Sequence, residues 1–185
     1  MGTTRNVAVI VGSLRKEAFS RKMAHALAAV APASLKLEIV EIGNLPLYNQ
    51  DDDANPTPAV VEFRNRIKAA DAVLFVTPEH NRSVPAALKN ALDVGSRPYG
   101  HSVWNKAPAA IVSVSPGAIG GFGANHHLRQ TLSFLNTPVL SQPEAYIGAA
   151  DKLFDASGAL INDGTRGFLT QFMKSFDEWI SRNAK

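Results

Sequence analysis

The chain has 185 residues, 45% of them hydrophobic and 19% charged, which is typical of a globular protein. It contains no cysteine, which excludes disulfides, iron–sulfur clusters and thiolate catalysis. No stretch approaches the ~20 apolar residues of a membrane span, and the N-terminus lacks the features of a secretory signal, so we expect a cytoplasmic protein. The net charge of +3 is scattered without a basic run, which favours small anionic ligands over nucleic acid.

Strand-like and helix-like patterns alternate along the chain. In order, we expect a strand over 6–11, a helix over 20–30, a strand over 35–42, a helix over 58–70, a strand over 72–76, a helix over 85–94, a strand over 109–114, a helix over 125–136, a broken strand over 138–147 and a helix over 164–182. Helical spacing places Met23, Ala24, Leu27 and Ala28 on one face, and Val61, Phe63 and Ile67 on an inward face.

This alternation predicts one α/β domain over residues 1–185. Strands joined by helices form a doubly wound parallel sheet, with right-handed crossovers covering both faces. We therefore expect three α/β/α layers around a five-stranded parallel sheet in the order 2-1-3-4-5. Ligands of such sheets bind beyond the carboxyl ends of the strands, which directs attention to three loops.

The first of these loops covers residues 12–20. Its hydroxyls and backbone N–H groups stand before a helix, where they form a natural phosphate pocket to which Arg15 could add a bidentate contact. It matches neither G-x-G-x-x-G nor a Walker loop, which argues against an ordinary dinucleotide fold or an NTPase. In the simpler alternative, Ser13 caps a turn, Ser20 is a helix N-cap and Arg15 is a solvated charge.

The second loop follows the apolar strand at 72–76 and is limited by Pro78 and Pro85. Between the prolines, the polar residues Glu79, His80, Asn81 and Ser83 could face a planar heterocycle. In the alternative, the segment is a polar turn with Pro85 at the first helical position, and His80 is a surface histidine. Lys89 and Asp93 would then be an exposed ion pair.

The third loop, residues 115–123, follows the strand at 109–114 and is rich in glycine. Glycines permit a close approach of the backbone to a ligand, although flexibility alone would also account for them. Because the carboxyl ends of parallel strands share one edge, we expect the three loops to meet where the strand order reverses.

At these loops the chain resembles the NADPH-dependent FMN reductase family, a flavodoxin-like group, and within it the bacterial NAD(P)H-dependent quinone and chromate reductases. The resemblance rests on Gly-Ser-Leu-Arg at 12–15, Thr-Pro-Glu-His-Asn at 77–81 and Leu-Lys-Asn-Ala-Leu-Asp at 88–93. It is reinforced by residues 113–121 and covers nearly the full chain.

The resemblance implies bound FMN and the electron donor NADH or NADPH. It places the phosphate at Ser13, Arg15, Ala18, Phe19 and Ser20, and it places the isoalloxazine ring against Pro78, Glu79, His80, Asn81 and Ser83, with Ser115 and Gly117 on the other side. Arg97 and His80 are candidate contacts for the nicotinamide or the acceptor. No metal is expected, and relatives of this kind are homodimers or homotetramers with flavin sites near subunit contacts.

Several positions depart from the family pattern. The family commonly has Gly-Ser-Phe-Asn where this chain has Glu-Ala-Phe-Ser at 17–20, so a phosphate-binding hydroxyl is lost at Ala18. Tyrosine is usual at the positions of His80 and Arg82, and tryptophan is common at that of Val94. An imidazole at position 80 could alter stacking of the acceptor or supply a titratable proton donor.

The resemblance therefore predicts an NAD(P)H:acceptor oxidoreductase that works by a ping-pong mechanism, in which hydride passes to flavin N5 and electrons then pass to quinones. Chromate, ferric complexes and azo compounds are further candidate acceptors. The alternatives are a flavodoxin-type electron carrier, which the basic composition disfavours, and a flavin-binding module without turnover.

Overall fold

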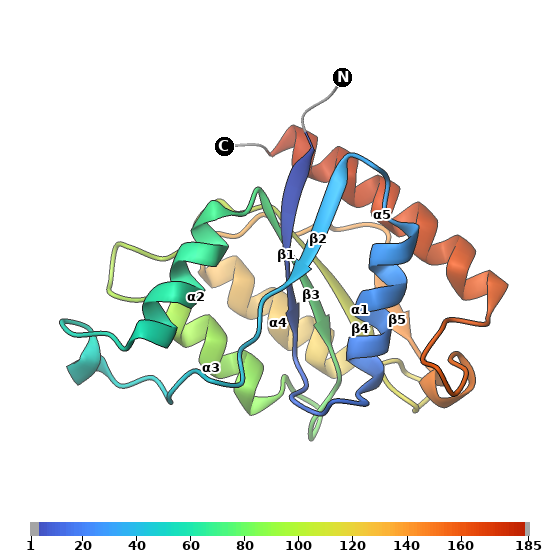
Figure 1. The fold of residues 1–185 in the computed structure, drawn as a ribbon, viewed down its shortest axis with the longest axis horizontal. Helices are drawn as coiled ribbons and strands as arrows, with labels where there is room; N and C mark the ends of the chain where they lie inside the picture. Colours follow the sequence, from blue (N-terminus) through green and yellow to red (C-terminus); the bar gives the residue numbers. More distant parts are fainter. Residues whose placement is uncertain (1–3, 184–185) are drawn as a thin grey trace.

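The computed structural model describes residues 4–183, which contain one parallel sheet in the strand order β2-β1-β3-β4-β5 (Figure 1). The strands are β1 (Arg5–Val11), β2 (Leu35–Ile39), β3 (Ala72–Thr77), β4 (Ala109–Val114) and β5 (Ala145–Ile147). Within this register Val9 pairs with Ile39 of β2 on one side and with Leu74 of β3 on the other. The predicted fold class and strand order are confirmed.

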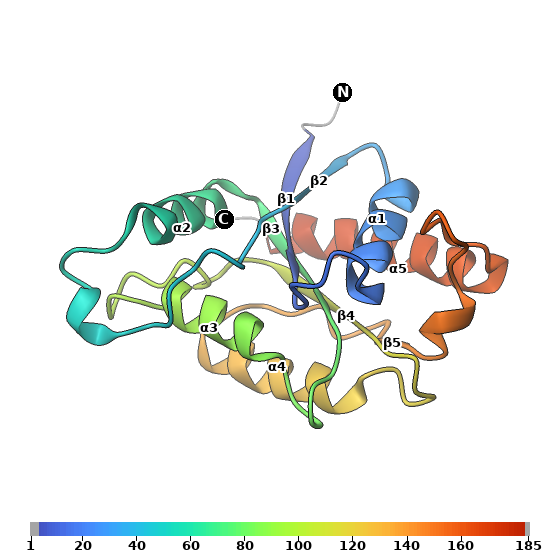
Figure 2. The same ribbon diagram turned by 60° about the horizontal axis from the view of Figure 1, so that its bottom comes forward.

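Helices cover both faces of the sheet, as Figure 2 shows. They are α1 (Phe19–Val30), α2 (Pro58–Ala69), α3 (Ala86–Gly95), α4 (Phe122–Phe134) and α5 (Asp163–Arg182). Val7, Val9 and Val11 pack with α1 and α5, whereas Ala8 and Ile10 belong to the core beneath α2, α3 and α4. In the described part of the chain, no helix is both long enough and apolar enough to cross a membrane.

Two residues expected in the core lie outside it. Val61 is 43% exposed, because the inward stripe of α2 runs through Val60, Phe63 and Ile67, and Val61 falls beside that stripe. Ala28 of α1 is likewise exposed.

Three elements differ most from their predicted bounds. Strand β2 ends at Ile39, because the chain then turns so that Val40 and Ile42 pack under the α2 face. Helix α4 begins at Phe122, directly after the glycine pair, and β5 is confined to three residues of the broken segment.

The irregular connection after α3 is held against the sheet by Trp104, which is fully buried. Its ring centroid lies 6.0 Å from that of Phe63 and 5.8 Å from that of Phe75. The indole Nε1 donates a hydrogen bond of 2.9 Å to the carbonyl of Leu92. A buried indole needs such a partner, so this segment is part of the core despite its lack of regular structure.

Candidate functional site

The loops that follow β1, β3 and β4 lie at one edge of the sheet, the lower edge in Figure 1. We call them loop 1 (12–18), loop 2 (78–85) and loop 3 (115–121). Loop 1 begins beside the end of β3, where the Gly12 N–H donates a hydrogen bond of 2.9 Å to the carbonyl of Val76. A β-carbon on Gly12 would also lie 3.2 Å from Pro78 Cδ. The predicted contact is therefore observed between loops 1 and 2.

Loop 1 leads into the N-terminus of α1 without a side-chain cap. The N-cap residue is Ala18, which supplies no side-chain hydrogen bond, and the first turn contains no acidic residue. The first amides of a helix have no intrahelical acceptor, and they lie at the positive end of the helix dipole. Ser13 Oγ accepts a hydrogen bond of 3.3 Å from the Arg15 amide, so the expected turn is present and leaves the Arg15 side chain exposed. This helix start is suited to an anion.

Ser20 supplies the observation that points most directly to a ligand. Its side chain is 1% exposed, and within residues 4–183 its Oγ has no hydrogen-bond partner. The alternative in which Ser20 is the N-cap is wrong, because Ser20 is the second residue of α1. Buried hydroxyls are nearly always hydrogen-bonded, and an anion at the start of α1 would provide the missing acceptor. The residues present therefore fit the phosphate of FMN.

The neighbouring Phe19 is half-buried beside this helix start. Its ring stacks on that of Phe154, with 6.4 Å between the ring centroids. This contact joins the beginning of α1 to the segment that follows β5.

Loop 2 contains a tight hairpin over residues 80–83. The amide of His80 donates to the carbonyl of Ser83 at 3.0 Å, and the amide of Ser83 donates back at 2.9 Å. Asn81 and Arg82 have φ values of 50° and 65°, the left-handed pair of a type I′ turn. Left-handed backbone outside glycine is often found at functional sites. The turn leaves the side chains of His80 and Asn81 exposed.

Of the alternatives proposed for loop 2, the exposed ion pair is observed, whereas Pro85 does not occupy the first helical position. Pro85 is the N-cap of α3, which begins one residue later than predicted, at Ala86. Lys89 and Asp93 do form an exposed ion pair on α3, with Nζ–Oδ1 at 2.8 Å. This pair lies outside the loops, and its geometry needs no ligand.

Two side chains of loop 2 are engaged by α4. Glu79 Oε2 accepts a hydrogen bond of 3.0 Å from the Ala124 amide, and Ser83 Oγ lies 2.9 Å from His127 Nδ1. The carboxylate of Glu79 is thus directed toward α4, which leaves the backbone of this residue for a ligand in the loop.

Loop 3 is closed by bonds from Ser115. Its amide donates to the carbonyl of Ile147 at 2.9 Å, and its Oγ accepts from the Gly117 amide at 3.1 Å. The loop ends at Gly121, the N-cap of α4, whose φ of 76° suits glycine. Gly117 is exposed, and loop 3 lies at the same edge of the sheet as loops 1 and 2.

Beside loop 3 lies an aromatic cluster of Phe122, His126 and Tyr146. The Phe122 ring centroid lies 4.2 Å from that of His126 and 5.3 Å from that of Tyr146. His126 Nε2 is 2.9 Å from the Tyr146 hydroxyl. Partial burial and, next, a hydrogen bond with Glu144 raise the pKa of Tyr146 to about 12. Tyr146 is therefore a neutral phenol at physiological pH.

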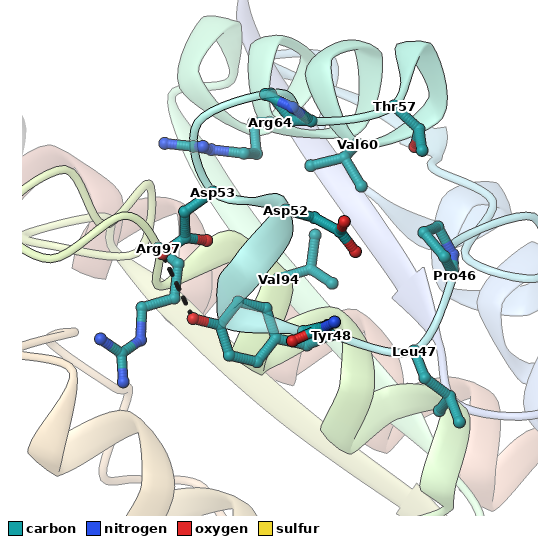
Figure 3. Close-up of a pocket in the computed structure, with 12 residues that line it drawn as sticks. Pro46, Leu47, Tyr48, Asp52, Asp53, Thr57, Val60, Arg64, Val94 and Arg97 are labelled. Atoms are coloured by element: carbon teal, nitrogen blue, oxygen red, sulfur yellow. Dashed lines mark hydrogen bonds between the residues drawn. The ribbon is translucent and has the colours of Figure 1, made fainter.

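Arg97 is not brought to the three loops. It follows α3, a helix that begins at loop 2 and runs about 15 Å to its other end, at a rise of about 1.5 Å per residue. Its guanidinium carbon lies 5.7 Å from the ring centroid of Tyr48 (Figure 3). Together they line a shallow hollow that also includes Val94 and Arg64. Burial raises the pKa of Tyr48, and the charge of Arg97 opposes that effect.

The residues that could not be predicted from the sequence are those whose partners lie far away along the chain. Tyr48 joins Arg97 from the segment after β2, and His127 meets Ser83 from α4. No periodicity or motif marks either residue. Among residues 4–183, no cluster of three or more histidine, aspartate or glutamate side chains is arranged to hold a metal ion.

The chain is similar to several known proteins along nearly its whole length. A quinone reductase of Pseudomonas putida is 61% identical over 184 residues, which cover 99% of this chain and 98% of that protein. A 2-hydroxy-1,4-benzoquinone reductase of a Burkholderia species is 45% identical, with 94% of this chain and 95% of that protein covered.

Among solved structures, the flavoenzyme NAD(P)H:(acceptor) oxidoreductase FerB of Paracoccus denitrificans superposes with a TM-score of 0.93. It is 39% identical, and the superposition covers 98% of this chain and all of FerB. Residues 5–152, which contain loops 1, 2 and 3, match the sequence profile of the NADPH-dependent FMN reductase family. The chain belongs to the NADPH-dependent FMN reductase family.

Proposed function

We propose that this protein is an FMN-dependent oxidoreductase that carries electrons from NADH or NADPH to quinones. The observation that carries this proposal is the buried, unpaired hydroxyl of Ser20 at the uncapped start of α1. Its position in a chain 61% identical to a quinone reductase supports an FMN phosphate as the missing partner.

The loops divide the binding of FMN among them in this proposal. Ser13, Arg15 and the backbone of residues 18–20 hold the phosphate through hydroxyls, a guanidinium and helix amides. The hairpin of loop 2, from Pro78 to Ser83, lies against one side of the ring system, and Ser115 and Gly117 border it from the other side. When bound, FMN accepts hydride at N5 and passes electrons to an acceptor.

The chain itself binds, orients and exchanges protons. His80 is exposed on the loop 2 hairpin, where its imidazole can donate a proton to a quinone being reduced. The site requires no other acid or base, because hydride transfer between two stacked rings needs mainly orientation. NAD(P)H and the acceptor occupy the same face in turn, which gives a ping-pong mechanism. Chromate, ferric complexes and azo compounds are further candidate acceptors.

Arg97 fits this scheme only if it acts on the site of a neighbouring subunit in an oligomer. It lies at the far end of α3 from its own loops, so we propose that it reaches the nicotinamide or an anionic acceptor across a subunit contact in a homodimer or homotetramer. Tyr48 then orients the guanidinium by the stacking already described. The cytoplasmic location expected from the sequence stays a prediction.

Steady-state oxidation of NAD(P)H by the purified protein, with and without benzoquinone, tests the proposal. We expect consumption of NAD(P)H that depends on the quinone and forms hydroquinone in equal amount. An absence of turnover, together with a stable one-electron semiquinone during dithionite titration, would identify an electron carrier instead. Bound flavin with neither behaviour would identify a binding module.

A further inference from the structure

The Glu79 carboxylate lies at the junction of loop 2, loop 3 and α4. Its side chain is only 13% exposed, although it stands on a surface loop between Pro78 and the exposed His80. Oε2 accepts the hydrogen bond from the Ala124 amide at 3.0 Å, and Oε1 lies 3.4 Å from Arg82 Nη1. Both oxygens are therefore occupied by groups of the protein.

Helix α4 depends on this carboxylate for its N-terminal cap. The N-cap residue Gly121 has no side chain, and the first turn of α4 contains no acidic residue. Glu79 supplies both the acceptor and the negative charge that a helix start favours, from 45 residues earlier in the chain. Because loop 3 leads directly into α4, the cap also fixes the end of loop 3 relative to loop 2.

The packing around the carboxylate leaves little freedom. A β-carbon on Gly123 would lie 2.9 Å from Glu79 Oε2 and 2.7 Å from the Arg82 carbonyl oxygen. A β-carbon on Gly121 would lie 3.7 Å from Glu79 Cβ. The hairpin of loop 2 and the start of α4 therefore meet through glycine backbone, with the carboxylate between them.

We infer that Glu79 is a positioning residue for FMN. It acts through the Ala124 amide, by holding loops 2 and 3 at the separation that admits the ring system, and it needs no contact of its own with the flavin. This inference rests on the proposed function. It assigns the side chain a role different from the polar contact with the ring that the sequence suggests.

To position the loops, the side chain at position 79 must place a hydrogen-bond acceptor at the Ala124 amide. Its negative charge is of secondary importance. Glu79→Gln keeps an amide oxygen that can accept from Ala124, whereas Glu79→Ala removes the acceptor. Gly123→Ala leaves the carboxylate in place but inserts a methyl group between it and the Arg82 carbonyl. Lys89→Ala, which breaks only the exposed pair with Asp93, is the control.

The test is the dissociation constant of FMN for each full-length variant, measured by quenching of flavin fluorescence after the protein has been stripped of flavin. We expect Glu79→Ala and Gly123→Ala each to raise the constant about tenfold or more, the loss of roughly one well-placed hydrogen bond. Glu79→Gln and Lys89→Ala should remain within about threefold of the parent. Far-UV circular dichroism of each variant checks its folding.

The outcomes are distinct. If the parent binds FMN and Glu79→Ala binds it equally well, the positioning role is wrong while the proposed function stands. Equal weakening by Glu79→Gln and Glu79→Ala would also overturn it, since the acceptor would then not be what matters. If Glu79→Ala does not fold, unchanged affinity in Gly123→Ala overturns the inference. A parent that does not bind FMN overturns the proposed function and this inference with it.

Discussion

A β-carbon on Gly12 would lie 2.7 Å from Thr77 Oγ1, closer than a β-carbon normally approaches another heavy atom. Gly12 is the first residue after β1, and Thr77 is the last residue of β3, the neighbouring strand. The two strands end at the same level, so loops 1 and 2 leave the sheet in contact with each other. This contact sets the distance between the phosphate end and the ring end of the proposed FMN site.

Gly12→Ala is expected to separate the two loops. Because Thr77 is fully buried and cannot yield easily, we expect a loss of about 1–3 kcal/mol in the free energy of unfolding, as for other overpacked sites. FMN affinity should fall as well. Urea denaturation and FMN titration measure the two effects. The control is Gly167→Ala in α5, where a β-carbon would have no neighbour within 4 Å and should not destabilise. Gly12→Ala with parental stability and affinity would refute the close contact.

Ser20→Ala separates the ligand-binding role of the hydroxyl from any structural role. Among residues 4–183 the Ser20 Oγ has no hydrogen-bond partner, so its removal should leave the free energy of unfolding of the FMN-free protein unchanged or raise it by up to about 1 kcal/mol. FMN affinity should fall about tenfold, because one acceptor–donor contact with the phosphate is lost. Ser133→Ala, at an exposed position on α4, serves as the control. A variant that is destabilised without FMN would show that the hydroxyl has a partner within the fold.

Trp104→Phe tests the segment that follows α3. The substitution removes the indole donor and leaves the buried Leu92 carbonyl without that partner, besides creating a small cavity. We expect a loss of about 2–4 kcal/mol in the free energy of unfolding, with FMN affinity unchanged in the folded protein. Thermal and urea denaturation measure the loss. An effect below about 1 kcal/mol would indicate that this segment is not an integral part of the core.

The ion pair between Glu41 and Arg21 is expected to make part of the free energy of unfolding depend on acid pH. Both carboxylate oxygens of Glu41 lie 2.8 Å from guanidinium nitrogens of Arg21, and this hydrogen bonding lowers the pKa of Glu41. A carboxyl whose pKa is lower in the folded state stabilises the protein above its ordinary pKa and ceases to do so as the pH falls. Because the Glu41 side chain is 59% exposed, Glu41→Gln should cost at most about 1 kcal/mol at pH 7, and this cost should shrink as the pH falls through the lowered pKa of Glu41.

Urea denaturation of the parent and of Glu41→Gln from pH 7 to pH 3 measures this component. Glu62→Gln, an exposed glutamate on α2, is the matched control. If the difference between Glu41→Gln and the parent is the same at both ends of the pH range, the ion pair is not its source.

The sheet could be predicted because its strands carry strong local signals. Ala72–Thr77 and Ala109–Val114 are buried at every position, and continuous apolar runs of that length are typical of central parallel strands. The loops of the site follow from those strands, since the carboxyl ends of parallel strands share an edge. Helix faces were harder to predict, as Val61 shows, because the inward stripe depends on the angle at which the helix packs on the sheet.

What the sequence could not predict are contacts between residues far apart in the chain. The hydrogen bond between Glu79 and Ala124 leaves no periodic or compositional trace, and neither does the stacking of Arg97 on Tyr48. To predict that the Ser20 hydroxyl is buried and unpaired, one would need to know where α1 begins. A shift of two residues in the helix start changes the role of this hydroxyl from an N-cap to a buried donor. Such errors at element ends are common, because capping is decided by local geometry.

The most direct test of the proposed function is the absorption spectrum of the purified protein before and after anaerobic addition of NADH or NADPH. We expect a yellow protein whose flavin bands are bleached by at least one of the two donors, and restored when benzoquinone is added. A colourless protein that does not take up FMN, or a flavin that remains oxidised in the presence of both donors, would contradict it.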